Sequence, residues 1–163
     1  MSEPTTLLLD TGILSALFED LGSTEAKRKA AQSFLERQIR KRNVLVCPPI
    51  SRIEFHKEHF RRTKQSNISE RINQLATNGI IFHKEFDTAN HNEYCAIFDN
   101  ATKYYATRPN SLADAFLAAE AAATRSVVIT FDPDFKEKYR DKEVMWFNPE
   151  QNQYSTSDVK RRL

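Results

Sequence analysis

The chain has 163 residues, of which 40% are hydrophobic and 28% charged, and its formal net charge is +2. This length suits one domain with a sizeable core, and the composition excludes an intrinsically disordered chain. No apolar run approaches the roughly 18 residues that a membrane span needs, and the N-terminus lacks the pattern of a signal peptide. We therefore expect a cytoplasmic protein without a membrane partner.

Apolar runs alternate with segments of helical periodicity along the chain. Strands are expected at 7–9, 44–47, 80–82, 127–131 and 144–147, and helices at 12–18, 25–41, 50–62, 68–77, 88–104 and 111–124. This alternation predicts an α/β fold, a three-layer α/β/α sandwich with a central, mostly parallel sheet of four to five strands. We expect one domain over residues 1–150 and a polar, frayed C-terminal tail over 151–163.

Positive charge is concentrated in one part of the chain. Residues 24–64 contain 12 Lys or Arg and 4 acidic residues, whereas the remaining residues contain 12 basic and 18 acidic ones. This asymmetry favours a polyanionic partner. A solvated helix face explains the same pattern without any partner.

Four acidic residues, Asp10, Glu54, Asp114 and Asp132, stand in apolar sequence that is expected to be buried. Ionised side chains are costly there unless they are paired or bind a cation, so the four together indicate a divalent-metal site. Asp10 and Asp132 each follow a strand, and ligands of open α/β sheets bind beyond the carboxyl ends of strands. These two acids would lie side by side if the first and fourth strands are neighbours.

Each acid also has a structural explanation that involves no metal. Asp10 and Asp132 could cap the helices that follow them, and Asp114 could complete a capping box. Glu54 could form an ordinary salt bridge with a basic neighbour in its own helix. Each of these explanations covers one position, whereas a shared metal site accounts for all four.

The sequence around these acids resembles the four motifs of the PIN-domain nucleases. Leu-Leu-Leu-Asp-Thr-Gly-Ile-Leu-Ser-Ala-Leu, which contains Asp10, is similar to the first motif, and Ile-Ser-Arg-Ile-Glu-Phe, which contains Glu54, to the second. Ser-Leu-Ala-Asp-Ala-Phe-Leu-Ala-Ala and Val-Val-Ile-Thr-Phe-Asp-Pro-Asp-Phe match the third and fourth more specifically. The resemblance extends from about Leu7 to Phe147, and the size is most similar to that of the VapC-like ribonuclease toxins of type II toxin–antitoxin systems.

This resemblance implies an endoribonuclease that depends on Mg²⁺ or Mn²⁺ and cleaves RNA phosphodiester bonds with a metal-activated water. It also implies a cognate antitoxin and a homodimer. The carboxylates that would hold the metal and act in catalysis are Asp10, Glu54, Asp114 and Asp132. The residues that could steady these ligands are Thr11, Thr130 and Asp134. Thr11 and Thr130 are equally well explained as ordinary strand-end residues, and Asp134 is better explained as a surface acid at a helix start.

RNA would be bound through its phosphates by basic residues in the segment that carries Glu54. The residues expected there are Arg52, Arg61, Arg62 and Lys64, and the basic helix at 25–41 adds positive charge nearby. Contacts to phosphate provide affinity without reading sequence, so these residues do not identify the target RNA.

Other interpretations stay open. The chain could be a PIN fold that has lost catalysis and serves as a binding or scaffold module, or a PIN nuclease that acts on DNA or another RNA-processing substrate. The Asp-Thr-Gly at Asp10 is also typical of aspartic proteases, but those enzymes are almost wholly β, and a helix is expected here. His56 and His59 could share a metal ion, although solvent-facing histidines explain them more simply.

Overall fold

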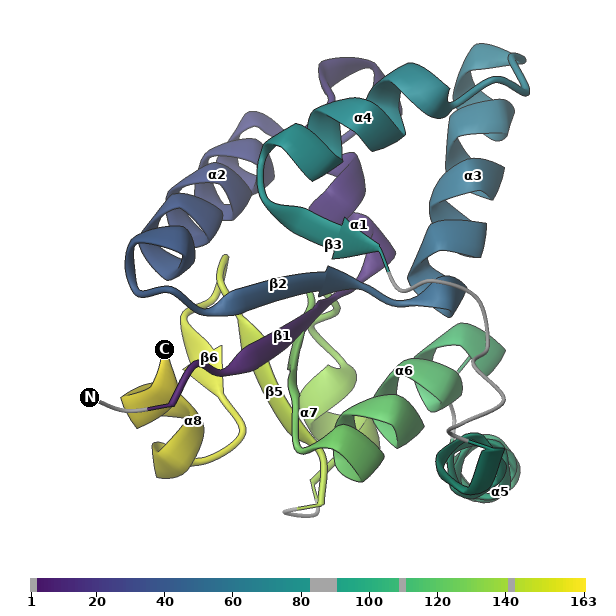
Figure 1. Cartoon of the computed structure of the whole chain (residues 1–163), viewed down its shortest axis with the longest axis vertical. Helices are drawn as coiled ribbons and strands as arrows, with labels where there is room; N and C mark the ends of the chain where they lie inside the picture. Colours follow the sequence, from purple (N-terminus) through teal and green to yellow (C-terminus); the bar gives the residue numbers. More distant parts are fainter. Residues whose placement is uncertain (1–2, 83–90, 109–110, 141–142) are drawn as a thin grey trace.

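The computed structural model describes residues 3–82, 91–108, 111–140 and 143–163. At its centre is a six-stranded sheet of order β3-β2-β1-β4-β5-β6 (Figure 1). The strands are β1 (Thr6–Leu9), β2 (Val44–Cys47), β3 (Ile80–Phe82), β4 (Val127–Ile129), β5 (Met145–Asn148) and β6 (Gln153–Tyr154). Strands β1 to β5 are parallel, and only β6 pairs antiparallel. The predicted α/β class with a mostly parallel sheet is confirmed, with one strand more than predicted.

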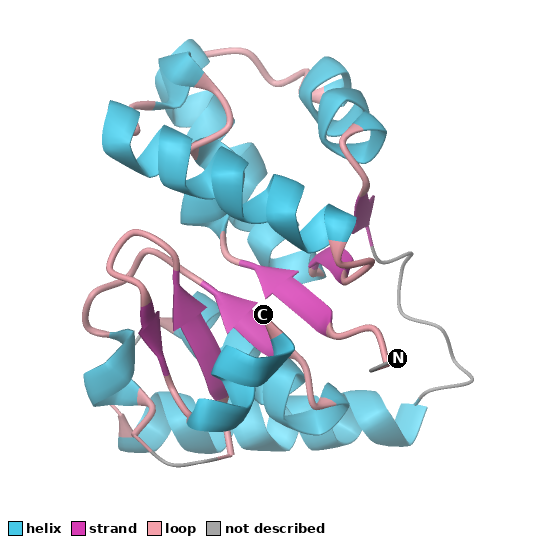
Figure 2. Ribbon diagram, turned by 90° about the vertical axis from the view of Figure 1, so that its left-hand side faces the viewer, coloured by secondary structure: helices cyan, strands magenta, loops and turns pink. Residues whose placement is uncertain are grey.

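Helices cover both faces of this sheet (Figure 2). They are α1 (Thr11–Ser15), the 3-10 helix η1 (Glu19–Leu21), α2 (Glu25–Arg40), α3 (Pro49–Thr63), α4 (Ser69–Thr77), α5 (His91–Thr107), α6 (Leu112–Thr124), α7 (Phe135–Lys138) and α8 (Ser157–Arg162). The predicted start of the fifth long helix, at residue 88, lies outside the described residues. None of the described helices is long and apolar enough to cross a bilayer.

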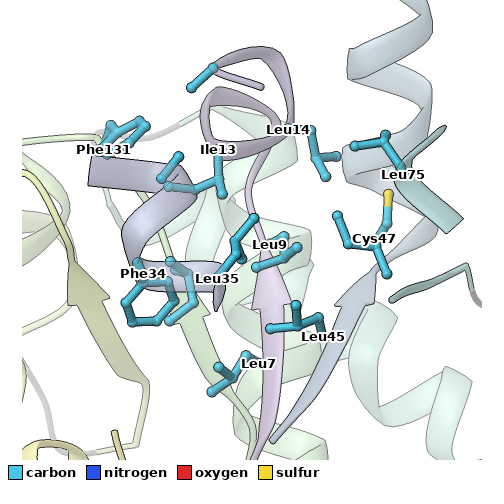
Figure 3. Close-up of a cluster of buried hydrophobic side chains, with 14 of the residues drawn as sticks. Leu7, Leu9, Ile13, Leu14, Phe34, Leu35, Leu45, Cys47, Leu75 and Phe131 are labelled. Atoms are coloured by element: carbon cyan, nitrogen blue, oxygen red, sulfur yellow. The ribbon is translucent and has the colours of Figure 1, made fainter. Parts of the chain in front are cut away.

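The sheet separates two hydrophobic cores, and β1 contributes to both. Leu7 and Leu9 pack with side chains of α2 such as Phe34 and Leu35 (Figure 3). Leu8 points to the other face, where α5, α6 and α7 cover the sheet. All three leucines of β1 are almost completely buried, which explains why the strand is a continuous apolar run rather than an alternating one.

The C-terminal residues form part of the fold, so the prediction of a frayed tail is wrong. Strand β6 extends the sheet by pairing with β5, and α8 follows it. The side chain of Val159 is fully buried, and the side-chain amide of Gln38 donates to the carbonyl of Leu163 at 3.2 Å. The segment appears polar in the sequence because only Val159 and Leu163 are buried in the core, while Tyr154 packs partly buried against it.

Candidate active site

The first contact of the site joins Asp10 to Thr130 across two neighbouring strands. Strands β1 and β4 pair in parallel with Leu9 opposite Ile129, so the two polar residues follow directly at adjacent carboxyl ends. The Thr130 hydroxyl donates to Asp10 Oδ2 at 2.7 Å, and the backbone N–H of Thr11 donates to Asp10 Oδ1 at 2.7 Å. Asp10 is therefore the N-cap of α1 and is also fixed by a contact 120 residues away.

The pKa of Asp10 is raised from its ordinary 3.8 to about 6. Burial is the largest cause, and the negative charges of Asp114 and Asp132 raise it further. The hydrogen bonds from Thr130 and Thr11 lower the pKa but do not compensate. Among the described residues no basic side chain pairs with Asp10, so its negative charge is not balanced by a direct ion pair.

Asp132 is held on both of its carboxylate oxygens. Its Oδ1 accepts from the backbone N–H of Asp134 at 2.9 Å, and its Oδ2 accepts from Lys138 Nζ at 2.7 Å. The Thr130 hydroxyl, besides donating to Asp10, accepts from the backbone N–H of Asp132 at 3.0 Å. Asp132 therefore forms a side-chain-stabilised turn, while Asp134 is the N-cap residue of α7. The exposed Asp134 contributes to the site through its backbone.

Asp114 reaches the same place from α6. The Ser111 hydroxyl caps this helix by accepting from the Asp114 backbone N–H at 3.1 Å. The Asp114 carboxylate accepts from Lys138 Nζ at 3.2 Å. A cap and a site contact thus coexist at Asp114, and the ammonium group of Lys138 lies between two of the predicted metal ligands.

Lys138 is a site residue that the sequence analysis missed. Burial alone would lower its pKa, but the hydrogen bonds and negative charges of Asp132 and Asp114 outweigh burial and hold the pKa above its usual value. The only signal in the sequence is a lysine six residues after Asp132, in a segment of alternating basic and acidic residues. Its approach to Asp114 depends on how α7 sits beside α6.

Glu54 is not brought into contact with the other three acids, and its nearest link to them is the hollow that it shares with Thr11, the residue after Asp10. It lines a hollow of about 210 Å³ between α1 and α3, together with Thr11 and Gly12 of α1 and Lys57 of α3. The Thr11 hydroxyl donates to the Ser51 carbonyl at 3.4 Å, so it ties α1 to α3 rather than steadying a carboxylate. In the described part of the chain, no hydrogen bond or ion pair joins Glu54 to the other three acids.

These residues have the chemistry that Mg²⁺ or Mn²⁺ requires. The donors are carboxylate oxygens, which such hard cations prefer, and Asp10 has neutral hydrogen-bond donors rather than a cationic partner. Over the described ranges, however, no three His, Cys, Asp or Glu side chains are gathered closely enough to hold an ion as they stand. The donor set fits a divalent cation, and its spacing has to tighten for one to bind.

The predicted RNA-binding residues are all exposed on or just after α3, but their charges are not equally available. Arg61 and Arg62 both pair with Glu58, at 2.8 and 3.1 Å, which partly neutralises them. The guanidinium of Arg52 lies 5.6 Å from the ring centre of Phe82. Lys57, which the sequence analysis did not select, faces the hollow beside Glu54.

The two histidines of α3 differ from expectation. His59 is only 3% exposed, so its predicted solvent-facing position is wrong, and its Nε2 lies 3.4 Å from the Thr63 hydroxyl. His56 is half-buried, and burial lowers its pKa. Both side chains fit structural positions in the packing of α3 rather than a shared metal site.

A second hollow, of about 310 Å³, is apolar and lies among α3, α5 and α6. It is lined by Pro49, Ile50, Ile53, Glu93, Tyr94, Ile97, Phe98, Phe116, Glu120 and Thr124. The pKa of Glu120 is raised to about 7, first by burial and then by the charge of Glu93. None of the four predicted metal ligands lines this hollow.

Comparison with protein-family models gives a match to the PIN domain over residues 7–141. The chain belongs to the PIN-domain family. It is therefore a member of a nuclease family, which confirms the resemblance seen in the four motifs. The comparison with curated proteins gives no match.

Several solved structures contain chains with a similar fold. One of them is a chain in the structure of VapBC2 from Rickettsia felis bound to a DNA fragment from the promoter of VapBC2. It has a TM-score of 0.62 and 14% sequence identity, and the match covers 88% of this chain and 98% of that one. A chain of VapBC-1 from nontypeable Haemophilus influenzae has a TM-score of 0.59 and 18% identity, with the same coverage. A chain of FitAB bound to an IR36 DNA fragment has a TM-score of 0.50 and 22% identity, covering 88% and 95%. At these identities the similarity establishes the fold alone.

Proposed function

We propose that this protein is a divalent-metal-dependent endoribonuclease and the toxin of a toxin–antitoxin pair. Its active centre is formed by Asp10, Asp114 and Asp132, with Glu54 at the side of the site. The observation that carries the proposal is the half-buried Asp10, whose pKa is raised by burial and by two other acids and whose hydrogen-bond donors are neutral. Such a group is costly in an uncharged pocket and favourable beside a cation.

Asp10, Asp114 and Asp132 would hold Mg²⁺ or Mn²⁺, which would supply a water of lowered pKa and neutralise charge on the phosphodiester. The protein's own part is to place the ligands. Thr130 orients Asp10, the backbone of Asp134 orients Asp132, and the first turn of α6 presents Asp114. These contacts are between backbone and short side chains, which leaves little freedom for the carboxylates to rotate away.

We infer that basic side chains bind RNA through its phosphates. α3 extends from Glu54 with exposed basic side chains on the same helix, and phosphate contacts of this kind bind a polyanion without reading its sequence. We also propose a toxin role, a cytoplasmic site of action and a homodimer. The toxin role and the homodimer are supported by the resemblance of the four motifs to those of VapC-like toxins. The similar solved structures come from VapBC and FitAB assemblies, which supports a search for a small protein partner.

The test compares purified wild type with Asp10→Asn on labelled RNA and DNA, with and without Mn²⁺. Asn caps helices as well as Asp does, so this substitution should preserve α1 and the fold. Asp99→Asn, the same change at an exposed residue of α5, is the matched control. We expect Mn²⁺-dependent RNA cleavage by wild type and the control, and a loss of about a thousandfold in Asp10→Asn.

Each alternative has its own outcome in this experiment. Cleavage of DNA but not RNA would assign a deoxyribonuclease, and no cleavage of either by wild type would assign a scaffold module. Expression of wild type and Asp10→Asn in cells tests the toxin role. Equal growth of the two, with no newly cleaved RNA ends in wild type, would contradict that role.

A further inference from the structure

Lys138 is built into the site rather than attached to its surface. Its neighbours in sequence, Phe135 and Tyr139, are both fully buried, with ring centres 4.6 Å apart. The Phe135 ring also contacts Trp146 of β5, and the Tyr139 ring contacts Tyr104 of α5. These contacts fix the short helix α7 on the core. Lys138, the last residue of α7, therefore has a defined position.

The ammonium group of Lys138 uses that position to bind two acids at once. It lies 2.7 Å from Asp132 Oδ2 and 3.2 Å from Asp114 Oδ2, and all three side chains retain only 17 to 21% of their exposure. A lysine on a solvated surface seldom keeps such a geometry, because its long side chain gains entropy by staying free. Here the two carboxylates would repel each other without a cation between them.

Because a divalent cation of the proposed function would need oxygens of the same two carboxylates, the two cations compete. A metal ion carries twice the charge of the ammonium group and approaches oxygen at about 2.1 Å, so both cannot occupy the space between Asp114 and Asp132 without strong repulsion. Asp10 does not contact Lys138, so it stays available to a metal ion throughout.

We propose that Lys138 is an internal competitor of the metal: its ammonium group holds Asp114 and Asp132 together in the metal-free protein and is displaced when a divalent ion binds. The ion pairs of Lys138 thereby stabilise the metal-free protein, and its metal affinity is lower than the same carboxylates would give without the lysine. This inference rests on the proposed metal site at Asp10, Asp114 and Asp132.

The test is calorimetric titration of Mn²⁺ into the full-length protein, with no nuclease assay involved. Lys138→Met removes the charge and keeps the length of the side chain, and we expect it to bind Mn²⁺ about tenfold more tightly than wild type. Lys136→Met, an equal charge change on the exposed side of α7, is the control and should stay within twofold of wild type. Metal-free Lys138→Met should also melt at a lower temperature and gain more from Mn²⁺ than wild type does.

The outcomes separate this inference from the proposed function. If wild type binds Mn²⁺ and Lys138→Met binds it equally or more weakly, the competitor role is overturned while the metal site stands. Equal tightening in Lys138→Met and Lys136→Met would also overturn it, since long-range charge would then suffice. If no variant binds Mn²⁺, both proposals fail. Lys138→Gln, which keeps a hydrogen-bond donor without charge, provides the same test if Lys138→Met does not fold.

Discussion

Asp10 and Glu120 are two partly buried carboxyl groups whose pKa values are raised mainly by burial, to about 6 and about 7. Their surroundings differ. Asp10 lies where two strands end and accepts two short hydrogen bonds. The negative charges of two further acids, Asp114 and Asp132, raise its pKa. Glu120 lines an apolar hollow between helices, where the negative charge of Glu93 raises its pKa further.

The difference shows that a perturbed pKa identifies a buried charge and not by itself a catalytic one. Asp10 differs because several elements bring polar groups to one place. Polar residues at the ends of β1 and β4 and in α6 and α7 contact Asp10 or the neighbouring acids Asp114 and Asp132. Four changes test that distinction, and they follow from the largest expected effect to the smallest.

The largest effect concerns the cost of ionising Asp10. Its pKa is raised in the folded state, so the folded protein binds this proton more tightly than the unfolded chain does. Stability from this group is therefore present below about pH 4 and is lost as pH rises to about 6, by about 3 kcal/mol. The free energy of urea unfolding should fall by this amount over this pH range in metal-free wild type, beyond any fall in Asp10→Asn. Parallel curves for the two proteins would contradict the assignment.

The next effect is that of Thr130, whose hydroxyl connects Asp10 to the Asp132 backbone. We expect Thr130→Val to lower RNA cleavage about 10- to 100-fold, since contacts that orient metal ligands have effects of this size. The pKa of Asp10 should also rise further, because the lost hydrogen bond lowers it, and carboxyl NMR titration would measure this. Thr102→Val, at an exposed threonine of α5, is the control and should change neither quantity.

Glu120 should affect stability and leave cleavage unchanged. Because the pKa of Glu120 is raised from 4.5 to about 7 in the folded state, the stability of the protein falls as pH rises between these two values. Glu120→Gln removes this cost, so we expect it to stabilise the protein by about 1 to 2 kcal/mol at pH 8 and to have little effect at pH 5. Thermal unfolding at both pH values measures this. A tenfold fall in cleavage would show that the apolar hollow belongs to the active site.

The smallest effect separates the two ends of α3. Arg52→Ala and Lys57→Ala should each weaken RNA binding about threefold to tenfold, because both residues are within one turn of Glu54. Arg61→Ala should have less effect, since Glu58 already pairs with this residue. Fluorescence anisotropy in the uncleaving Asp10→Asn background measures these affinities. Equal losses at both ends would mean that RNA follows the whole helix.

Much of the fold and of the site could be predicted because the signals are local. Three consecutive leucines in β1 indicate a strand with both faces covered, and Ser111 marks the start of α6. The rule for parallel sheets puts Asp10 and Asp132 beyond the carboxyl ends of their strands and makes them neighbours only if the first and fourth strands pair. The structure supplies that condition, because β1 pairs with β4.

Other features could not be predicted because they depend on how distant elements pack. The polar C-terminal segment joins the core through Val159, Leu163 and the partly buried Tyr154, which are too few to produce a periodic pattern. His59 is buried because α3 turns that side chain toward its neighbours, although the surrounding sequence is basic and polar. Thr11 and Thr130 looked equivalent in sequence, but only the hydroxyl of Thr130 reaches a carboxylate.

The sequence by itself predicted which residues carry the chemistry, namely four acids within family motifs, three of them at strand ends or a helix start and Glu54 inside a helix. The tertiary structure alone decided how they are paired, with Thr130 on Asp10 and Lys138 between Asp114 and Asp132. The physical reason is range. Strand, helix and cap preferences act over a few residues, whereas a hydrogen bond between groups 24 or 120 residues apart depends on the register of the sheet and the seating of short helices on its core.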